Sequence, residues 1–157
     1  MSKAWPDLAG HLVPGGHVLP VRVYFEDTDF TGFVYHASYL RFMERGRSDF
    51  IRSLGVSHQE LDSGVHGERL GFAVRRMTID FLKPARIDDV VEVHTRPLPG
   101  KGVRLELAQS IRRGAEVLVE ASLTIVVVNA GGRPRRLPDA LRARLVAAGG
   151  LPGEEPG

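Results

Sequence analysis

The second half of the chain reads as strand-like segments in close succession, which limits the folds that it can adopt. Residues 103–113 alternate apolar and polar side chains, the pattern of a strand with one buried face. Residues 117–128 begin in the same way and end Ile-Val-Val-Val, which is typical of a strand covered on both faces. Two earlier strand-like segments lie at residues 73–82 and 89–96. The links at residues 97–102 and 113–115 are short enough for hairpins. The pattern therefore predicts an antiparallel sheet.

One long helix is predicted before these strands. From Ser38 onward the apolar residues follow a helical period and form a single stripe. The stripe consists of Tyr39, Phe42, Met43, Gly46, Phe50 and Leu54. Ser38 suits the N-cap, and Gly55 suits the position after the C-terminus. Because Gly46 lowers helix propensity by about 1 kcal/mol, we expect the helix to approach a sheet closely at this residue.

Shorter elements flank this helix and the strands. A first strand is predicted at residues 18–26, a helical turn at 58–62, and a terminal helix around Leu141, Leu145 and Val146. One helix and about five mostly hairpin-linked strands give an α+β fold. The helix can cover only one face of the sheet, so the other face must meet solvent, the chain ends or a partner subunit. The two-sided apolar character of residues 117–128 favours a partner.

The domain organisation is simple. A chain of 157 residues suits a single domain with a sizeable core, which we expect to span residues 18–148. Residues 1–17 contain several prolines and glycines and no period, so they predict a flexible N-terminal arm. Residues 149–157 predict a frayed C-terminal tail.

Composition excludes several classes of function. The chain contains no cysteine, which excludes disulfides, thiolate metal sites and a cysteine nucleophile. No apolar run reaches about 18 residues and no signal peptide is visible, so we expect a cytoplasmic protein without a membrane span. A net charge of +2, without aromatic residues interleaved among the basic ones, argues against a nucleic-acid partner. No group of side chains has metal-ligand spacing.

The segment between the first strand and the helix combines acidic residues with a glycine. Residues 24–36 read Tyr-Phe-Glu-Asp-Thr-Asp-Phe-Thr-Gly-Phe-Val-Tyr-His. Asp29 lies in a loop that opens onto the helix N-terminus, where unsatisfied backbone N–H groups attract negative charge. A carboxylate beside oxyanion donors is what acyl-group hydrolysis requires. The alternative is that Asp29 only caps a turn before Gly32.

This segment, continued by Phe42, Glu44, Arg45 and Arg47, resembles the YbgC-type acyl-CoA thioesterases of the 4-hydroxybenzoyl-CoA thioesterase family. The resemblance also covers residues 72–81, 84–89 and 133–138, which is nearly the whole domain. It implies a hotdog fold, in which an antiparallel sheet of about five strands wraps one long helix. It also implies a homodimer or homotetramer with sites at the subunit interface. Phe25 replaces a tyrosine that the family usually carries, so any hydroxyl contribution is absent there.

The resemblance assigns the chemistry to two residues. Asp29 matches the catalytic carboxylate of the family, and would act either as a nucleophile on the thioester carbonyl or as a general base on water. The backbone N–H near His36 would polarise the thioester oxygen, and its side chain could orient Asp29 or water.

Four further residues are candidates for binding substrate. Gly32 would allow tight loop geometry beside the substrate or is simply a turn glycine, and Tyr35 would shape the pocket or the core. By the resemblance, Arg135, and less strongly Lys101, would contact the phosphates of coenzyme A. Solvated surface charge is the alternative for both basic residues. No metal or separate cofactor is expected, because coenzyme A is part of the substrate.

The predicted reaction is hydrolysis of an acyl-CoA to free coenzyme A and a carboxylic acid, and acyl carrier protein is a second possible carrier. A hotdog enoyl-CoA hydratase is one alternative, since such enzymes also use an Asp and a His. Their Asp-x-Asn-Pro-x-His signature is absent between Asp29 and His36. A non-catalytic acyl-binding protein is another alternative, against which the presence of Asp29 argues.

Overall fold

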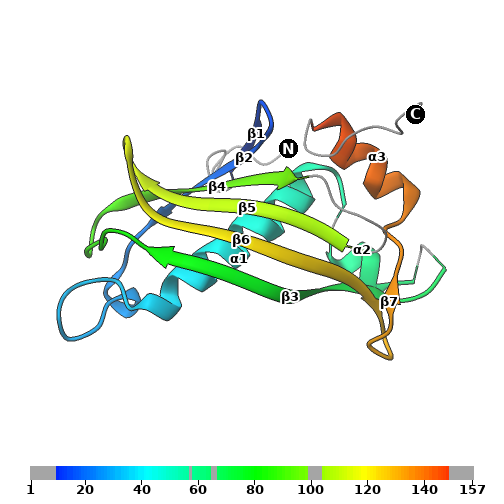
Figure 1. The fold of residues 1–157 in the computed structure, drawn as a ribbon, viewed down its shortest axis with the longest axis horizontal. Helices are drawn as coiled ribbons and strands as arrows, with labels where there is room; N and C mark the ends of the chain where they lie inside the picture. Colours follow the sequence, from blue (N-terminus) through cyan, green and yellow to red (C-terminus); the bar gives the residue numbers. More distant parts are fainter. Residues whose placement is uncertain (1–9, 57, 65–66, 99–103, 149–157) are drawn as a thin grey trace, which may run out of the picture.

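Residues 10–56, 58–64, 67–98 and 104–148 are described by the structure, a computed structural model. The strands are β1 (His11–Val13), β2 (Gly16–Arg22), β3 (Leu70–Phe81), β4 (Val90–Leu98), β5 (Arg104–Arg113), β6 (Glu116–Asn129) and β7 (Pro134–Arg135). The helices are α1 (His36–Ser53), α2 (His58–Asp62) and α3 (Asp139–Ala147), and a short 3-10 turn spans Phe25–Asp27. Figure 1 shows their arrangement.

The strands form one antiparallel sheet in the order β1-β2-β4-β5-β6-β3, and β7 pairs with β6. The long helix α1 lies across one face of this sheet (Figure 1). The predicted α+β hotdog fold, with one long helix wrapped by an antiparallel sheet, is therefore confirmed. The 12-residue strand β3 forms one edge of the sheet.

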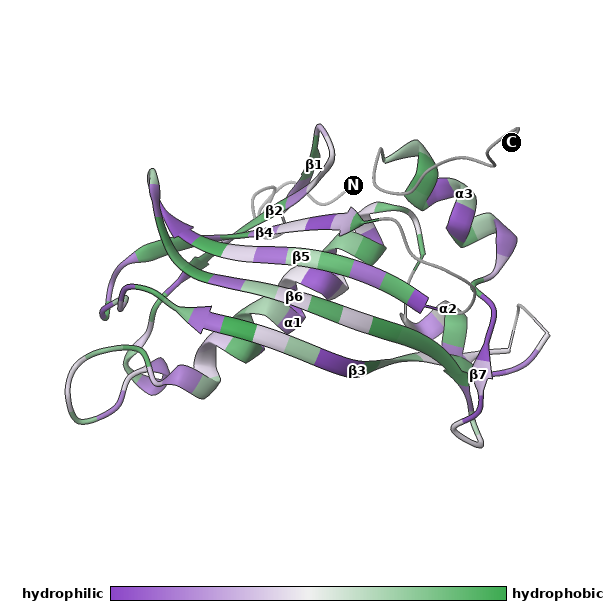
Figure 2. Ribbon diagram, in the orientation of Figure 1, coloured by the Kyte–Doolittle hydropathy of each residue, from purple (hydrophilic) through white to green (hydrophobic). Residues whose placement is uncertain are grey.

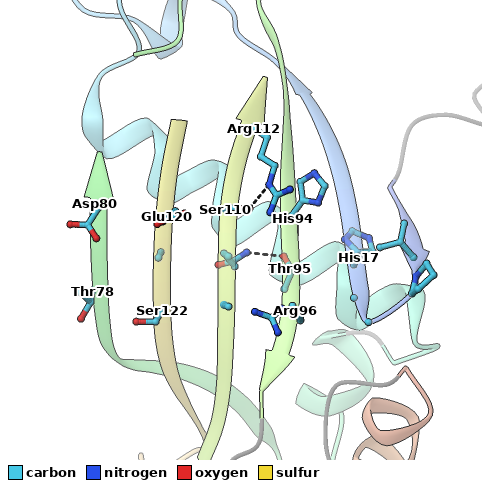
Figure 3. A pocket seen from close by; sticks show the side chains of 17 residues that line it. His17, Thr78, Asp80, His94, Thr95, Arg96, Ser110, Arg112, Glu120 and Ser122 are labelled. Carbon is cyan, nitrogen blue, oxygen red and sulfur yellow. Dashed lines mark hydrogen bonds between the residues drawn. The ribbon is translucent and has the colours of Figure 1, made fainter. Parts of the chain in front are cut away.

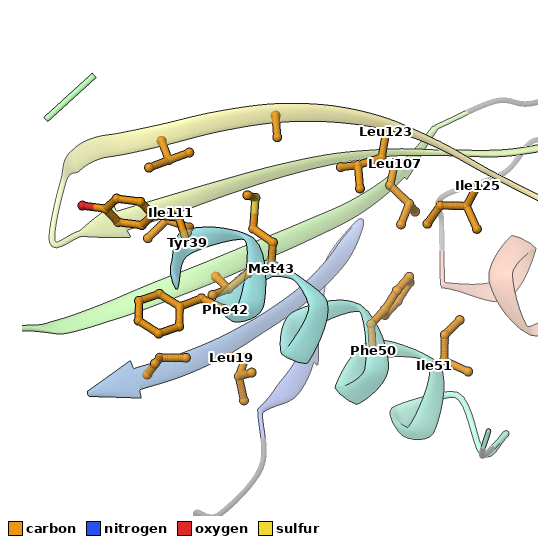
Figure 4. Packing of buried hydrophobic residues seen from close by; sticks show 14 of the residues in the cluster. Leu19, Tyr39, Phe42, Met43, Phe50, Ile51, Leu107, Ile111, Leu123 and Ile125 are labelled. Carbon is orange, nitrogen blue, oxygen red and sulfur yellow. The ribbon is translucent and has the colours of Figure 1, made fainter. Parts of the chain in front are cut away.

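The core lies between α1 and the sheet (Figure 4). Phe42 and Met43 of α1 and Val91 and Val93 of β4 are fully buried there. At Gly46 an added Cβ would lie only 2.6 Å from Cγ1 of Val93. The helix can approach the sheet so closely only because this residue has no side chain, which confirms the predicted close approach.

The apolar end of β6 is buried on both faces, as predicted, and Figure 2 shows its continuous apolar stretch. Val126 and Val127 point to opposite faces and are 8% and 1% exposed. This burial occurs within one chain. The run therefore does not by itself require a partner subunit.

The N-terminal arm predicted at residues 1–17 is wrong for its second part. Strands β1 and β2 form a hairpin in which His11 pairs with Val18. The turn contains Pro14 and Gly15, and Gly15 has a φ of +80°. Proline followed by a glycine of positive φ is typical of a type II turn, so these residues signal a turn rather than a lack of structure. Residues 1–9 and the predicted tail at 149–157 lie outside the described residues.

A buried polar cluster joins this hairpin to α1. His17 Nε2 lies 2.8 Å from Asp49 Oδ2, and the two residues are only 1% and 4% exposed. The N–H of Gly10 donates to the same oxygen at 2.9 Å, and the guanidinium of Arg52 bonds the other oxygen. Burial alone would raise the pKa of Asp49, but these hydrogen bonds outweigh it and hold the pKa below its usual value.

The first strand ends earlier and the long helix begins earlier than predicted. Strand β2 ends at Arg22, and a 3-10 turn replaces the end of the predicted strand. The buried Asp27 carboxylate accepts the N–H of Tyr24 at 2.8 Å, and its backbone oxygen accepts the N–H of Tyr35 at 2.9 Å. Tyr35 therefore takes the N-cap position, and α1 begins at His36 instead of after Ser38.

Candidate active site

The loop between β2 and α1 folds into a tight turn around Asp29. Thr28 and Val34 form an isolated antiparallel bridge. Inside it, the N–H of Asp29 donates to Phe33 O and the N–H of Gly32 donates to Asp29 O, both at 3.0 Å. Gly32 has a φ of +84°, and a Cβ added there would meet nothing within 4 Å. The backbone conformation, not a lack of space, explains this glycine.

The carboxylate of Asp29 is exposed and accepts two hydrogen bonds from one neighbour. Thr31 donates to Oδ1 from its hydroxyl at 2.5 Å and from its backbone N–H at 2.9 Å. The hydroxyl first, and then the backbone N–H, favour the charged form and hold the pKa of Asp29 below its usual value. Asp29 does cap its turn, as the alternative interpretation expects, and this role keeps the carboxylate ionised.

Helix α1 begins just after this turn, with free backbone donors. Within the described part of the chain, no acceptor bonds the N–H groups of His36 and Ala37 at the start of the helix. The ring of His36 packs against Tyr35 and Phe81, with centroid distances of 4.5 and 6.1 Å. Two free N–H groups at the positive end of a helix can stabilise negative charge on a bound oxygen.

Exposed apolar side chains surround the loop. An open hollow beside Asp29 is lined by Phe25, Glu26, Thr28, Phe30, Gly32 and Ile87. Phe25 is 80% exposed and Phe30 is fully exposed. Tyr35 and Phe81, beside the start of α1, are each 47% exposed. Contiguous apolar exposure of this kind marks a surface that binds a ligand or a partner.

Arg135 does not lie near Asp29 within one chain. It belongs to β7, which pairs with β6 at the end of the sheet opposite the Asp29 loop (Figure 1). Its Nε donates to Glu68 at 3.0 Å, a partner not expected from the sequence. Lys101 lies outside the described residues. The predicted site residues that the structure brings together are Asp29, Gly32, Tyr35 and His36.

Thr31 is the site residue that sequence reasoning missed. It stands two positions after Asp29, the spacing at which an aspartate side chain bonds the backbone and hydroxyl of a turn. That spacing is visible in the sequence. The effect of the hydroxyl on the pKa of Asp29 is not, because it depends on the 2.5 Å contact.

A different hollow lies on the outer face of the sheet, away from α1 (Figure 3). Its lining includes small side chains such as Thr78, Ala108 and Ser122. Acidic residues line it on the side of β3 and β6, and basic residues on the side of β5 and β4, namely Asp80, Glu120, Arg112, His94 and Arg96. None of the predicted site residues lines this hollow, which has the polar character of a solvated sheet face.

Two negative findings concern only the described residues. Their His, Asp and Glu side chains nowhere form a group of three or more that could hold a metal ion. None of the helices among them is long and apolar enough to cross a membrane.

Comparison with known proteins places the chain in a family. The family model of the thioesterase-like superfamily matches residues 23–145. The acyl-CoA thioester hydrolase YbgC of Escherichia coli O6:H1 is 41% identical over 126 residues, which cover 79% of this chain and 91% of the relative. The chain is a YbgC-type member of the thioesterase-like superfamily.

Two further matches support this membership. The acyl-CoA thioesterase YbgC of Haemophilus influenzae is 35% identical over 133 residues, covering 84% of this YbgC-type chain and 96% of the relative. A crystal structure of a probable thioesterase from Bartonella henselae has a TM-score of 0.77 and 48% identity, covering 78% of this chain and 99% of that one. The predicted family and the predicted class of enzyme, a thioesterase, are confirmed.

Proposed function

We propose that this YbgC-type protein hydrolyses acyl-CoA thioesters to coenzyme A and a carboxylic acid, with Asp29 as the catalytic carboxylate. One observation carries the proposal. An ionised Asp29 stands in the turn that leads into α1, whose first N–H groups, those of His36 and Ala37, have no acceptor within the described residues. The name of the Escherichia coli relative, an acyl-CoA thioester hydrolase, supports the class of substrate.

The geometry suits attack on a thioester carbonyl. The carbonyl oxygen would face the N–H groups of His36 and Ala37, which stabilise the negative charge that develops during attack. One such donor is worth about 3 kcal/mol in the transition state. Thr31 engages Oδ1 of Asp29, which leaves Oδ2 for the chemistry.

Two routes follow from this arrangement. Asp29 Oδ2 attacks the carbonyl carbon to give a mixed anhydride that water then cleaves, or it takes a proton from an attacking water. In both routes the C–S bond breaks, the thiolate of coenzyme A leaves and takes up a proton, and water supplies one oxygen. A single turnover in isotopically labelled water separates them, because only the anhydride route can place the label in Asp29.

The proposed function is tested by free-thiol release from a panel of short, long and aromatic acyl-CoAs. We expect release from at least one class. Loss of enoyl-CoA absorbance without thiol release would indicate a hydratase instead, and binding without turnover would indicate an acyl-binding protein. Release only from acyl carrier protein thioesters would keep the chemistry and change the carrier.

We also propose that two chains pair through β3. This strand is 12 residues long and bonds β6 on one side, while its other side has no partner strand within the described chain. Long unpaired edges invite pairing with another strand. Val74 and Phe81 are 47% exposed along this edge. Antiparallel pairing about a two-fold axis would continue the sheet across two copies.

Such pairing would account for the distance between Arg135 and Asp29. In an antiparallel two-fold pair, the Phe81 end of β3 faces the Leu70 end of β3 in the second copy. Phe81 packs against His36, beside the Asp29 loop. Strand β7 lies at the Leu70 end of the sheet. Arg135 of the second copy would therefore approach the Asp29 loop, where a guanidinium suits the phosphates of coenzyme A.

The pairing through β3 predicts the mass of the protein in solution. Sedimentation equilibrium should give the mass of two or four chains. Val74→Asp places a charge on the exposed edge, so it should reduce the mass to one chain and abolish hydrolysis. Ser122→Asp, on the exposed outer face of β6, is the matched control and should change neither. A parent that hydrolyses acyl-CoA as a single chain would contradict the pairing.

Removal of the Thr31 hydroxyl should shift the acid limb of the activity. Thr31→Val keeps the backbone hydrogen bond and loses the hydroxyl donor, so the pKa of Asp29 should rise toward its usual value near 3.8. Because Asp29 acts as the carboxylate, kcat/KM of the variant should fall at a higher pH than that of the parent. Thr28→Val, whose hydroxyl donates to Phe25 O, should leave the limb in place. If kcat/KM of Thr31→Val and of the parent fell at the same pH, Asp29 would be excluded as the titrating group.

A further inference from the structure

A mostly apolar groove of about 310 Å³ lies between α1 and β3. Its apolar lining consists of Phe50, Ile51, Phe72, Val74, Leu105, Leu107 and Ile125. Figure 4 shows Phe50 and Ile51 of α1 opposite Leu107 and Ile125 of the sheet. The volume is at the lower end of the range for small-molecule pockets, so this α1–β3 groove suits a short acyl group.

The guanidinium of Arg47, on α1, lines the groove. The polar residues that line the groove are Glu44, Arg47 and Ser48. Nη1 of Arg47 donates to Oε1 of Gln109 at 3.1 Å. Gln109 is only 3% exposed, and its amide nitrogen donates to Met43 O at 3.0 Å and to Thr95 Oγ1 at 2.9 Å. Gln109 is thus fixed in the core and orients the guanidinium toward the sheet.

Most N–H donors of the Arg47 guanidinium have no acceptor within the described chain. Of its five N–H donors, the described chain uses one, in the bond to Gln109. Burial lowers the pKa of Arg47 and the charge of Glu44 opposes this shift, yet an arginine stays charged. Glu44 is exposed, so solvent screens its charge, whereas Arg47 is half-buried. A half-buried, forked donor beside apolar walls fits a carboxylate.

The groove lies within reach of an active site only across the proposed pair, and this step rests on the proposed function. Within one chain, His36 and Arg47 are 11 positions apart along α1, which corresponds to about 16.5 Å. Two-fold pairing through β3 instead places the Phe72 and Val74 half of one strand beside the Phe81 half of the other. The groove of one copy would then open beside the Asp29 and His36 site of the second, since Phe81 packs against His36.

We propose that the α1–β3 groove receives the acyl group of the thioester bound at the second copy, and that Arg47 selects acyl groups that end in a carboxylate. The substrates of this class are coenzyme A monothioesters of short dicarboxylic acids. Hydrolysis of such a substrate gives coenzyme A and the free dicarboxylate. Arg47 acts on substrate choice, and Asp29 on the reaction itself.

The test compares glutaryl-CoA with pentanoyl-CoA, which share the same carbon chain and differ in the terminal carboxylate. Thiol release gives kcat/KM for both substrates with the parent, Arg47→Met, Arg47→Lys and Arg41→Met. The ratio of glutaryl-CoA to pentanoyl-CoA should fall by about ten- to hundredfold in Arg47→Met, the loss expected for a charge-assisted hydrogen bond. Arg47→Lys keeps the charge but loses the forked guanidinium, so its ratio should lie between those of the parent and Arg47→Met. Arg41, exposed on the same helix and outside the groove, is the matched control and should keep the parental ratio.

Two results would overturn the proposal and leave the thioesterase function intact. One is a parent that prefers pentanoyl-CoA, and the other is an Arg47→Met variant that loses both substrates in equal proportion. If the parent releases no thiol from either thioester, the binding of the two thioesters, measured by calorimetry, tests the groove instead. Tighter binding of glutaryl-CoA that requires Arg47 would support the groove while the proposed function fails. Equal binding, or none, would overturn both.

Discussion

Replacing Asp29 with asparagine should lower kcat for acyl-CoA hydrolysis by about 10²- to 10⁴-fold, the usual contribution of a general base. Oδ1 of asparagine can still accept both hydrogen bonds from Thr31, so the turn should keep its shape. The variant loses only the negative charge, and with it the basicity and nucleophilicity of the carboxylate. Because the side chain is exposed, the substitution leaves no gap in the core.

Thiol release under saturating substrate measures this effect. Asp80→Asn is the matched control, since Asp80 is also an exposed aspartate but lies on the outer face of β3. Melting temperatures should agree among the parent and both variants, which separates loss of catalysis from loss of fold. Asp29→Asn with parental kcat would remove Asp29 from the mechanism, and the two free N–H groups of α1 would then act with another base.

Replacing Asp49 with alanine should lower the free energy of unfolding by about 3 kcal/mol. The carboxylate accepts hydrogen bonds from His17 and from the N–H of Gly10, and alanine accepts none. His17 is almost fully buried, and its Nδ1 has no partner among the described residues. The variant would leave both nitrogens of this ring unsatisfied, which is costly away from water.

Urea unfolding at several pH values measures the effect of Asp49. The pKa of Asp49 is held below its usual value near 3.8, so its contribution is fully present above that value and is lost as the pH falls through the lower, folded-state pKa. The difference in the free energy of unfolding between the parent and Asp49→Ala should therefore become smaller as the pH falls. Arg52→Ala is the control: the Arg52 side chain is 65% exposed, so its loss should cost under about 1 kcal/mol. Equal effects of the two substitutions would show that the buried bonds to His17 and Gly10 contribute little.

The fold could be predicted from the sequence because its signals are local. The alternation along β5 and the helical stripe of α1 each record which side of an element faces the core. Gly46 added a long-range clue, since a glycine within a helix suggests a close neighbour, and the neighbour is Val93. The Asp29 turn was accessible for the same reason, because the hydrogen bonds that Asp29 makes with Thr31, Gly32 and Phe33 lie within a few residues.

Contacts between distant segments could not be predicted in this way. Arg47 and Gln109 are 62 positions apart, and no periodicity links them. Arg135 was assigned to the site by resemblance, yet within one chain it lies at the other end of the sheet and pairs with Glu68. Alternation tells which face a residue occupies but not which strand it lies beside. The β1–β2 hairpin was missed for a different reason, since proline and glycine mark a turn as readily as an unstructured segment.

The strand order has a consequence for how the protein folds. Strands β4, β5 and β6 are consecutive in the chain and adjacent in the sheet, whereas β2 reaches β4 and β3 reaches β6 only across long stretches of sequence. Closing such long loops costs entropy before the new contacts repay it, so the three-stranded meander should form first and the flanking strands afterwards. The Asp29 loop follows β2, and its Val34 N–H bonds Ala85 O in the link between β3 and β4. The Asp29 turn should therefore acquire its shape only in the last stage of folding, and the appearance of activity during refolding should lag behind the formation of the sheet.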